Sequence, residues 1–151
     1  MFSPVPDVLA YLAGRWTVIR TLEDLSTGAT GEFRGTADIQ PSGDGTCALF
    51  VEDGELTWGG TTNQAGRTLH LLPRPDGTAD VTFADGRPFH DLDLRSGRWA
   101  VHHPCSRDRY EGTFTVVSPD EWQVRWRTAG PAKDHVQQSV YRRAPSLPPG
   151  H

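Results

Sequence analysis

Four side chains that can move protons are concentrated in the second half of the sequence. They are two imidazoles, a phenol and a carboxylate: His90, His103, Tyr110 and Asp108. An imidazole titrates near neutral pH, a phenol can donate to a developing oxyanion, and a carboxylate can orient either group. If these side chains face one cavity, they are suited to general acid–base catalysis on a bound metabolite. We therefore predict His103, Tyr110, His90 and Asp108 as catalytic residues.

Each of these residues also has a structural interpretation, which the sequence leaves open. A single histidine such as His90 more often makes a satisfied polar contact at a rim than a catalytic one. His102 alternates away from His103 and is expected to face solvent. Asp108 could fix a histidine tautomer or pair with a buried arginine, Arg20. The prediction of catalysis depends on several such groups meeting in one place.

Other chemistries at the same residues fit less well. Cys105 could act as a nucleophile beside His103, but Pro104 holds the chain between them in an extended kink. Imidazole, thiol and carboxylate are acceptable ligands for zinc or iron, yet their spacing here matches no regular metal motif. The sequence has neither a phosphate-binding glycine-rich loop nor a dinucleotide motif. We expect no cofactor, with a divalent metal as an alternative.

The composition is that of one globular domain. The chain has 151 residues, 36% of them hydrophobic and 23% charged, and includes five Trp and six Phe. Its net charge of −4 argues against nucleic-acid or anionic-membrane partners, which need clustered Lys and Arg. No apolar run is long enough for a membrane span and no signal segment is present, so we expect a cytoplasmic protein. In that setting Cys47 and Cys105 are expected to be free thiols.

One short helix and a series of strands must position these residues. Asp7 is expected to cap a helix that ends at Gly14. After it come segments that alternate with period two and are separated by turns such as Asp76-Gly77 and Ser96-Gly97. The segments are 16–25, 31–40, 47–53, 56–63, 68–72, 79–84, 89–94, 98–103, 109–117, 122–128 and 136–142.

Consecutive hairpins without long crossovers predict an antiparallel meander. A meander of about 8–10 strands with one capping helix most economically closes into a barrel, which removes exposed strand edges. We therefore predict an all-β fold with one domain over residues 1–144. Residues 145–151 form a Pro-rich tail that is expected to be loose.

Alternation along each strand predicts which side chains enter the barrel. If Trp16 points inward, then Val18, Arg20 and Leu22 do too, and a buried Arg20 needs an acidic or carbonyl partner. We expect Lys133, in the turn before the last strand, either to belong to a rigid turn or to reach over the open end to an anionic ligand. The predicted ligand-binding residues are Arg20, Glu52, Phe83, Phe89, Trp99, Cys105, Phe114, Trp126 and Lys133.

The start of the first strand resembles the lipocalin and calycin superfamily. A short helix runs into Gly14-x-Trp16, the signature in which the Trp plugs the closed end of the barrel. The resemblance implies that an Arg from the last strand lies across the indole, and Arg142 or Arg143 stands in the right place, with Arg142 taken as the barrel-closing residue. Because some small calycin barrels bind haem, the resemblance also keeps haem open as an alternative.

The chain from Leu12 to Arg143 also resembles a bacterial lipocalin-like family known only as domain of unknown function 6314. The likeness implies a fold and no activity. The matching motifs are Leu12-x-Gly14-x-Trp16-x-x-x-Arg20, Glu52-x-Gly54, Phe83-x-Asp85-Gly86-x-x-Phe89-His90, His103-x-Cys105-x-x-Asp108-x-Tyr110-x-Gly112, and Trp126-x-x-x-Gly130-Pro131-x-Lys133-Asp134.

Two function classes follow from these residues. The first is a cofactor-independent isomerase, cyclase or lyase acting on a small, partly apolar metabolite. The second is a non-catalytic carrier or sensor, in which the aromatic rings form the walls and the polar groups orient the ligand. A purely structural barrel packed solid with side chains is a third interpretation. The expected partner is a small molecule, and a homodimer is left open.

Overall fold

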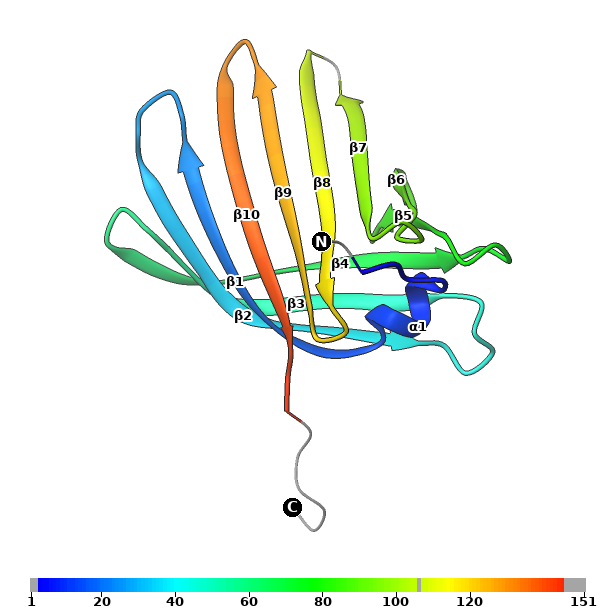
Figure 1. The fold of residues 1–151 in the computed structure, drawn as a ribbon. Coiled ribbons are helices and arrows are strands. Elements are labelled where there is room, and N and C mark those ends of the chain that lie inside the picture. The colour runs from blue at the N-terminus through cyan, green and yellow to red at the C-terminus, as the bar shows by residue number, and fades with distance from the viewer. Residues whose placement is uncertain (1–2, 106, 146–151) are drawn as a thin grey trace.

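The structure is a computed structural model that describes residues 3–105 and 107–145, excluding the Cys105 side chain. Within these described residues, ten antiparallel strands form one sheet and one helix precedes them (Figure 1). The elements are α1 (Val8–Leu12), β1 (Gly14–Asp24), β2 (Thr30–Pro41), β3 (Ala48–Trp58), β4 (Thr61–Pro73), β5 (Ala79–Phe83), β6 (Pro88–Leu92), β7 (Arg98–Cys105), β8 (Asp108–Ser118), β9 (Glu121–Gly130) and β10 (Lys133–Arg143). The predicted all-β meander is confirmed, and most of the predicted tail lies outside the described residues.

The sheet curls into a nearly closed barrel. The strand order is β6-β5-β4-β3-β2-β1-β10-β9-β8-β7, so β1 pairs with β10 and the two edges are β6 and β7. In Figure 1 the edge strands lie next to each other on the right of the barrel. Across this seam the indole Nε1 of Trp99 donates to the carbonyl oxygen of Asp91 at 2.9 Å. The seam is therefore closed by side chains, while strand ladders close the rest of the barrel.

The helix begins where the sequence predicts. The Asp7 carboxylate accepts hydrogen bonds from the amides of Leu9 and Ala10 at 3.1 and 3.2 Å, which satisfies two of the free N–H groups of the first turn. Gly14 has φ +117°, a backbone conformation that L side chains rarely adopt. In the described part of the chain, no helix combines the length and hydropathy needed to cross a bilayer.

Two predicted strand boundaries are wrong. The segments 47–53, 56–63 and 68–72 are in fact two long strands, β3 and β4, joined by a turn at Gly59 and Gly60. The prediction leaves Gly54 between two strand segments, but this residue continues β3 opposite Gly35 of β2. A Cβ on Gly54 would collide with the carbonyl oxygen of Arg34, so this glycine permits a close approach of two strands rather than a reversal of the chain.

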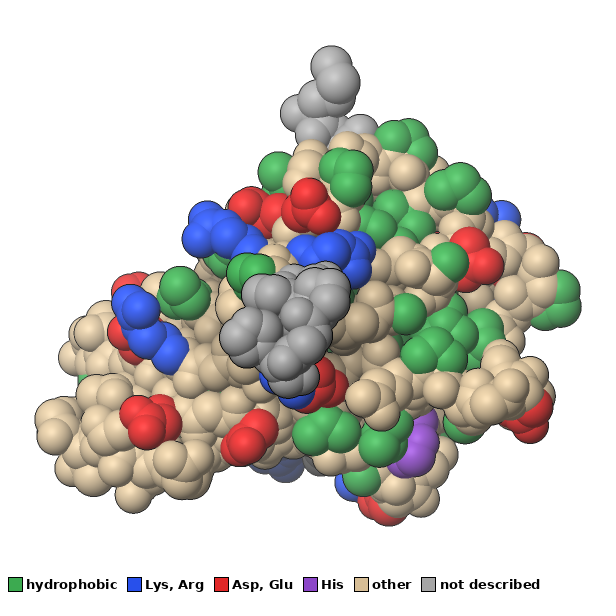
Figure 2. Space-filling view, turned by 90° about the horizontal axis from the view of Figure 1, so that it is seen from below, with side chains coloured by type: hydrophobic (Ala, Val, Ile, Leu, Met, Phe, Trp, Pro, Cys, Tyr) green, Lys and Arg blue, Asp and Glu red, His purple; other side chains and the backbone are tan. Residues whose placement is uncertain are grey.

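Trp16 closes one end of the barrel, as the resemblance implies. Its side chain is fully buried, and its Nε1 donates to the carbonyl oxygen of Leu12 at 2.8 Å. The stacking arginine is Arg143, whose guanidinium carbon lies 4.2 Å from the ring centroid, and the choice of Arg142 is wrong. Because side chains alternate along β10, Arg142 faces outward, where it pairs with Glu121 at 3.0 Å. Figure 2 shows the molecule from below, with basic and acidic side chains next to each other on this face.

Candidate functional site

A cluster of charged and hydroxyl side chains lies inside the barrel, centred on Glu52 of β3. The Glu52 carboxylate is 2% exposed and Arg20 is 8% exposed. Nη2 of Arg20 donates to both carboxylate oxygens, at 3.0 and 2.9 Å, and Nε of Arg67 donates to Oε1 at 2.9 Å. The hydroxyl of Tyr141 donates to Oε2. Nε of Arg20 donates to the hydroxyl oxygen of Ser139 at 2.6 Å.

These contacts fix the protonation states in the cluster. Burial by itself would raise the pKa of Glu52, but the charges of Arg67 and Arg20, with hydrogen bonds from Arg20 and Tyr141, hold that pKa below its ordinary value. Burial, followed by the negative charge of Glu52, raises the pKa of Tyr141 to about 12. At neutral pH the cluster therefore consists of a carboxylate, a neutral phenol and two guanidinium groups.

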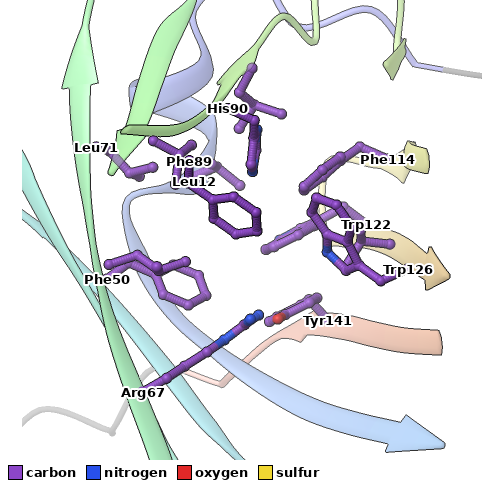
Figure 3. Close-up of a pocket in the computed structure, with 14 residues that line it drawn as sticks. Leu12, Phe50, Arg67, Leu71, Phe89, His90, Phe114, Trp122, Trp126 and Tyr141 are labelled. Atoms are coloured by element: carbon purple, nitrogen blue, oxygen red, sulfur yellow. The ribbon is translucent and has the colours of Figure 1, made fainter. Parts of the chain in front are cut away.

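An apolar cavity of about 40 Å³ adjoins this cluster. Figure 3 shows its walls, in which Arg67 reaches from β4 toward the hydroxyl of Tyr141 and aromatic rings lie around the remaining space. A second cavity, of about 120 Å³, lies on the polar side and is lined by residues that include Arg20, Glu52 and Phe33. Arg67 lines both cavities. The first cavity is lined by Leu12, Phe50, Arg67, Leu69, Leu71, Val81, Phe89, His90, Leu92, Phe114, Trp122, Val124, Trp126 and Tyr141.

Phe89, on the short edge strand β6, covers the apolar cavity from the seam side. Its ring stacks on Phe83 with 4.6 Å between centroids and 18° between planes. It also stacks on Trp126, at 5.3 Å and 17°. His90 and His103 approach the same ring edge-on, with centroid distances of 4.7 and 5.4 Å. Phe89 is thus the centre of an aromatic cluster built from β5, β6, β7 and β9.

The four predicted catalytic residues do not form a hydrogen-bonded relay. The ring of Phe89 contacts both His90 and His103, two residues that the sequence analysis expects to meet at one site. Tyr110 lies beside His103 at 6.1 Å between centroids. Asp108 neither orients a histidine nor pairs with Arg20, because its carboxylate pairs with Lys133 at 3.2 Å. This contact at the rim raises the pKa of Lys133.

Of the other predicted ligand-binding residues, four lie at the charge cluster or at the apolar cavity. Arg20 and Glu52 belong to the buried charge cluster, whereas Phe114 and Trp126 line the apolar cavity. Trp99 closes the seam through its bond to Asp91. The side chain of Cys105 lies outside the described residues, and Cys47 is a free thiol. Among the described side chains, no group of three or more His, Cys, Asp or Glu is placed to hold a metal ion.

Sequence reasoning missed several residues of the site. Arg67 escapes the prediction because the predicted strand begins at Thr68, whereas β4 begins at Thr61. The buried Tyr141 and Trp122 stack at 3.7 Å between centroids with parallel planes. The signal that could have found Tyr141 and Ser139 is alternation along β10, which places both on the inner face.

Known structures share the fold. The S-type phycobiliprotein lyase CPES from Guillardia theta aligns over 96% of this chain and 95% of its own, with a TM-score of 0.66 and 12% identity. A de novo designed fluorescence-activating β-barrel aligns over 93% of this chain and 100% of its own, with a TM-score of 0.50 and 20% identity. At these identities the likenesses show the fold, a lipocalin-like barrel. No curated protein matches the sequence.

The family assignment comes from the sequence over nearly its full length. The model described as "Family of unknown function (DUF6314)" matches residues 12–143. This range starts just before Trp16 and ends at Arg143, so it contains both residues that close the barrel. The chain therefore belongs to the DUF6314 family, with the lipocalin-like fold that its motifs implied.

Proposed function

We propose that the barrel binds a small, planar, largely apolar molecule, which inserts where the ring of Phe89 now lies. The observation that carries the proposal is the nearly parallel stack of Phe83, Phe89 and Trp126. Two aromatic faces that hold a flat ring between them are complementary in shape and in charge distribution to any flat ligand. In this conformation Phe89 occupies the place of such a ligand.

The position of Phe89 favours its displacement. The apolar cavity beside it measures about 40 Å³ and is too small for a metabolite, since small-molecule pockets usually measure about 300–1,000 Å³. β6 is five residues long and forms one edge of the sheet, so it can move without breaking a ladder to β7. Withdrawal of the Phe89 ring would join the slot to the cavity and open both toward the seam.

The first test removes the ring that fills the slot. We expect the neutral planar probe 2-naphthamide to bind the unmodified protein and to bind Phe89→Ala about tenfold more tightly, because the probe no longer displaces a packed ring. Titration calorimetry, with quenching of tryptophan fluorescence as a second signal, measures the dissociation constants. Leu72→Ala, which shortens an exposed side chain on β4, serves as the control and should bind like the unmodified protein. Weaker binding by Phe89→Ala, or no binding by either protein, would contradict the proposal.

A second candidate function, acid–base chemistry on the bound molecule, is supported by His90. Its Nδ1 lies 2.7 Å from the carbonyl oxygen of Asp91, and because a carbonyl can only accept, Nδ1 carries the proton. Burial lowers the pKa of His90, so the imidazole is neutral at pH 7 and its Nε2 has a free lone pair. His90 lines the apolar cavity, where this nitrogen could act as a base. His103 and Tyr110 would join it only after Phe89 moves.

Proton exchange at carbon tests this second candidate without any cofactor. We expect the protein in D₂O to speed loss of the proton next to the carbonyl of 1-tetralone, and His90→Gln to reduce the protein-dependent rate about 100-fold. The rate should fall as pH is lowered through the His90 pKa, below the ordinary imidazole range, because protonation removes the lone pair. Proton NMR follows the exchange. His102→Gln, on the exposed side of β7, is the matched control, and an equal loss in both variants would exclude His90 as the base.

A further inference from the structure

The buried cluster carries an excess positive charge. Glu52 accepts four hydrogen bonds, two from Arg20, one from Arg67 and one from Tyr141, which uses the capacity of a carboxylate. The two guanidinium groups stay protonated, and the raised pKa of Tyr141 keeps that phenol neutral. Two positive charges against one negative charge leave one positive charge unbalanced inside the barrel. His90 does not add to it, since its lowered pKa keeps it neutral.

Arg67 is the part of this cluster that a ligand can reach. The Arg20 side chain is 9% exposed, whereas 37% of the Arg67 side chain remains accessible. Arg67 uses its Nε for Glu52, and its far end lies beside the hydroxyl of Tyr141 (Figure 3). The same residue lines both cavities. A guanidinium presents five N–H donors in a planar fork, a geometry that matches a carboxylate.

An unpaired donor on a residue that lines the apolar cavity points to the same kind of ligand group. In the described part of the chain, Nε1 of Trp122 is the buried side-chain polar atom without a hydrogen-bond partner. Trp122 is 4% exposed, lines the apolar cavity and stacks on Tyr141. Leaving a buried N–H unpaired is unfavourable, so a ligand that brings an acceptor atom to this ring gains affinity.

We propose that the natural ligand is a planar organic acid whose carboxylate is received by Arg67 and by the indole N–H of Trp122. This inference rests on the proposed function, because the aromatic slot must first admit the body of the molecule. It adds the chemical class: a flat apolar body carrying one negative charge, which balances the excess charge of the cluster. The interior therefore discriminates between an acid and its neutral analogue of the same shape.

The test compares two probes of nearly the same shape, one an anionic carboxylate and the other a neutral carboxamide. We expect 2-naphthoate to bind the unmodified protein at least about tenfold more tightly than 2-naphthamide. Arg67→Gln, which leaves Arg20 and Glu52 paired, should abolish this preference while retaining the affinity for 2-naphthamide. Arg67→Lys should restore much of the preference, and Trp122→Phe should weaken 2-naphthoate binding severalfold. Arg125→Gln, on the exposed outer side of β9, is the matched control and should leave both affinities unchanged.

The outcomes separate this inference from the proposed function. If both probes bind equally well, or if Arg67→Gln keeps the preference for the acid, the inference is wrong and the binding proposal stands. If neither probe binds, even to Phe89→Ala, both proposals are wrong. Loss of folding in Arg67→Gln, monitored by circular dichroism, would leave the decision to the comparison between Arg67→Lys, Trp122→Phe and the unmodified protein. In that comparison, the inference is overturned if the unmodified protein does not prefer 2-naphthoate, or if Trp122→Phe binds 2-naphthoate as tightly as the unmodified protein does.

Discussion

Replacing Glu52 with alanine is expected to lower the free energy of unfolding by about 3–5 kcal/mol. The substitution removes the carboxylate that Arg20, Arg67 and Tyr141 share and leaves two guanidinium charges inside the barrel without their acidic partner. Taking one member out of a buried ion pair is more unfavourable than losing the same pair at the surface, because the remaining charge cannot be solvated. Urea unfolding followed by circular dichroism measures the difference at neutral pH.

Glu55→Ala is the matched control for this variant. Glu55 lies on the same strand but is exposed, so its replacement should change the free energy of unfolding by no more than about 0.5 kcal/mol. The pH dependence gives a further check. Because folding lowers the pKa of Glu52, its contribution is present above the unfolded-state pKa and is lost as pH falls through the folded-state pKa. Equal losses for the two variants, or an unchanged acid limb in Glu52→Ala, would show that the cluster does not stabilise the fold.

The Trp16→Ala variant should lose about 3–5 kcal/mol of unfolding free energy. Trp16 is fully buried, packs against Tyr11 and Trp122 at centroid distances of 5.6 and 6.1 Å, and is covered by Arg143. Its removal leaves a void at the closed end. It also removes the hydrogen bond from the indole to the carbonyl oxygen of Leu12, which joins α1 to the barrel. Thermal and urea unfolding, both followed by circular dichroism, give the size of the loss.

Trp58→Ala provides the comparison, since Trp58 is 39% exposed at the end of β3. We expect it to lower the unfolding free energy less, because Trp58 already has more than a third of its surface in solvent and its removal leaves no enclosed cavity. Trp16→Phe should lie between the two variants, since it keeps much of the packing and loses the hydrogen bond to Leu12. A result in which Trp16→Ala and Trp58→Ala are equally stable would contradict the role of Trp16 as the plug of the barrel.

Strand alternation in the sequence was sufficient to predict much of the interior. The row Trp16, Val18 and Arg20 on β1 is buried as predicted, and the same alternation accounts for the buried Phe33, Ala37 and Ile39 on β2. These predictions succeeded because side-chain direction has a strict period of two along a strand, so one fixed residue determines its neighbours on both sides. The helix was predictable for a similarly local reason, namely that Asp7 bonds to amides two and three residues away.

The errors concern contacts between strands. Gly54 resembles a turn residue because glycine is common in turns, and only the facing backbone of Arg34 shows why glycine is required there. Closeness in sequence favoured a contact between Asp108 and the histidines, whereas the hairpin between β9 and β10 brings Lys133 to it. Arg143 rather than Arg142 stacks on Trp16 because the pairing of β1 with β10 places Arg143 opposite Trp16.

The sequence alone determined the meander, its capping helix and the inner face of most strands, since each depends on hydrogen bonds and alternation within a few residues. Only the tertiary structure decided the partners of the buried charges, with Arg20 and Arg67 meeting on Glu52 and Phe89 standing between two imidazoles. These contacts join residues far apart in the chain, and their distances follow from strand register and the curvature of the closed sheet. Residue spacing along the sequence contains neither quantity.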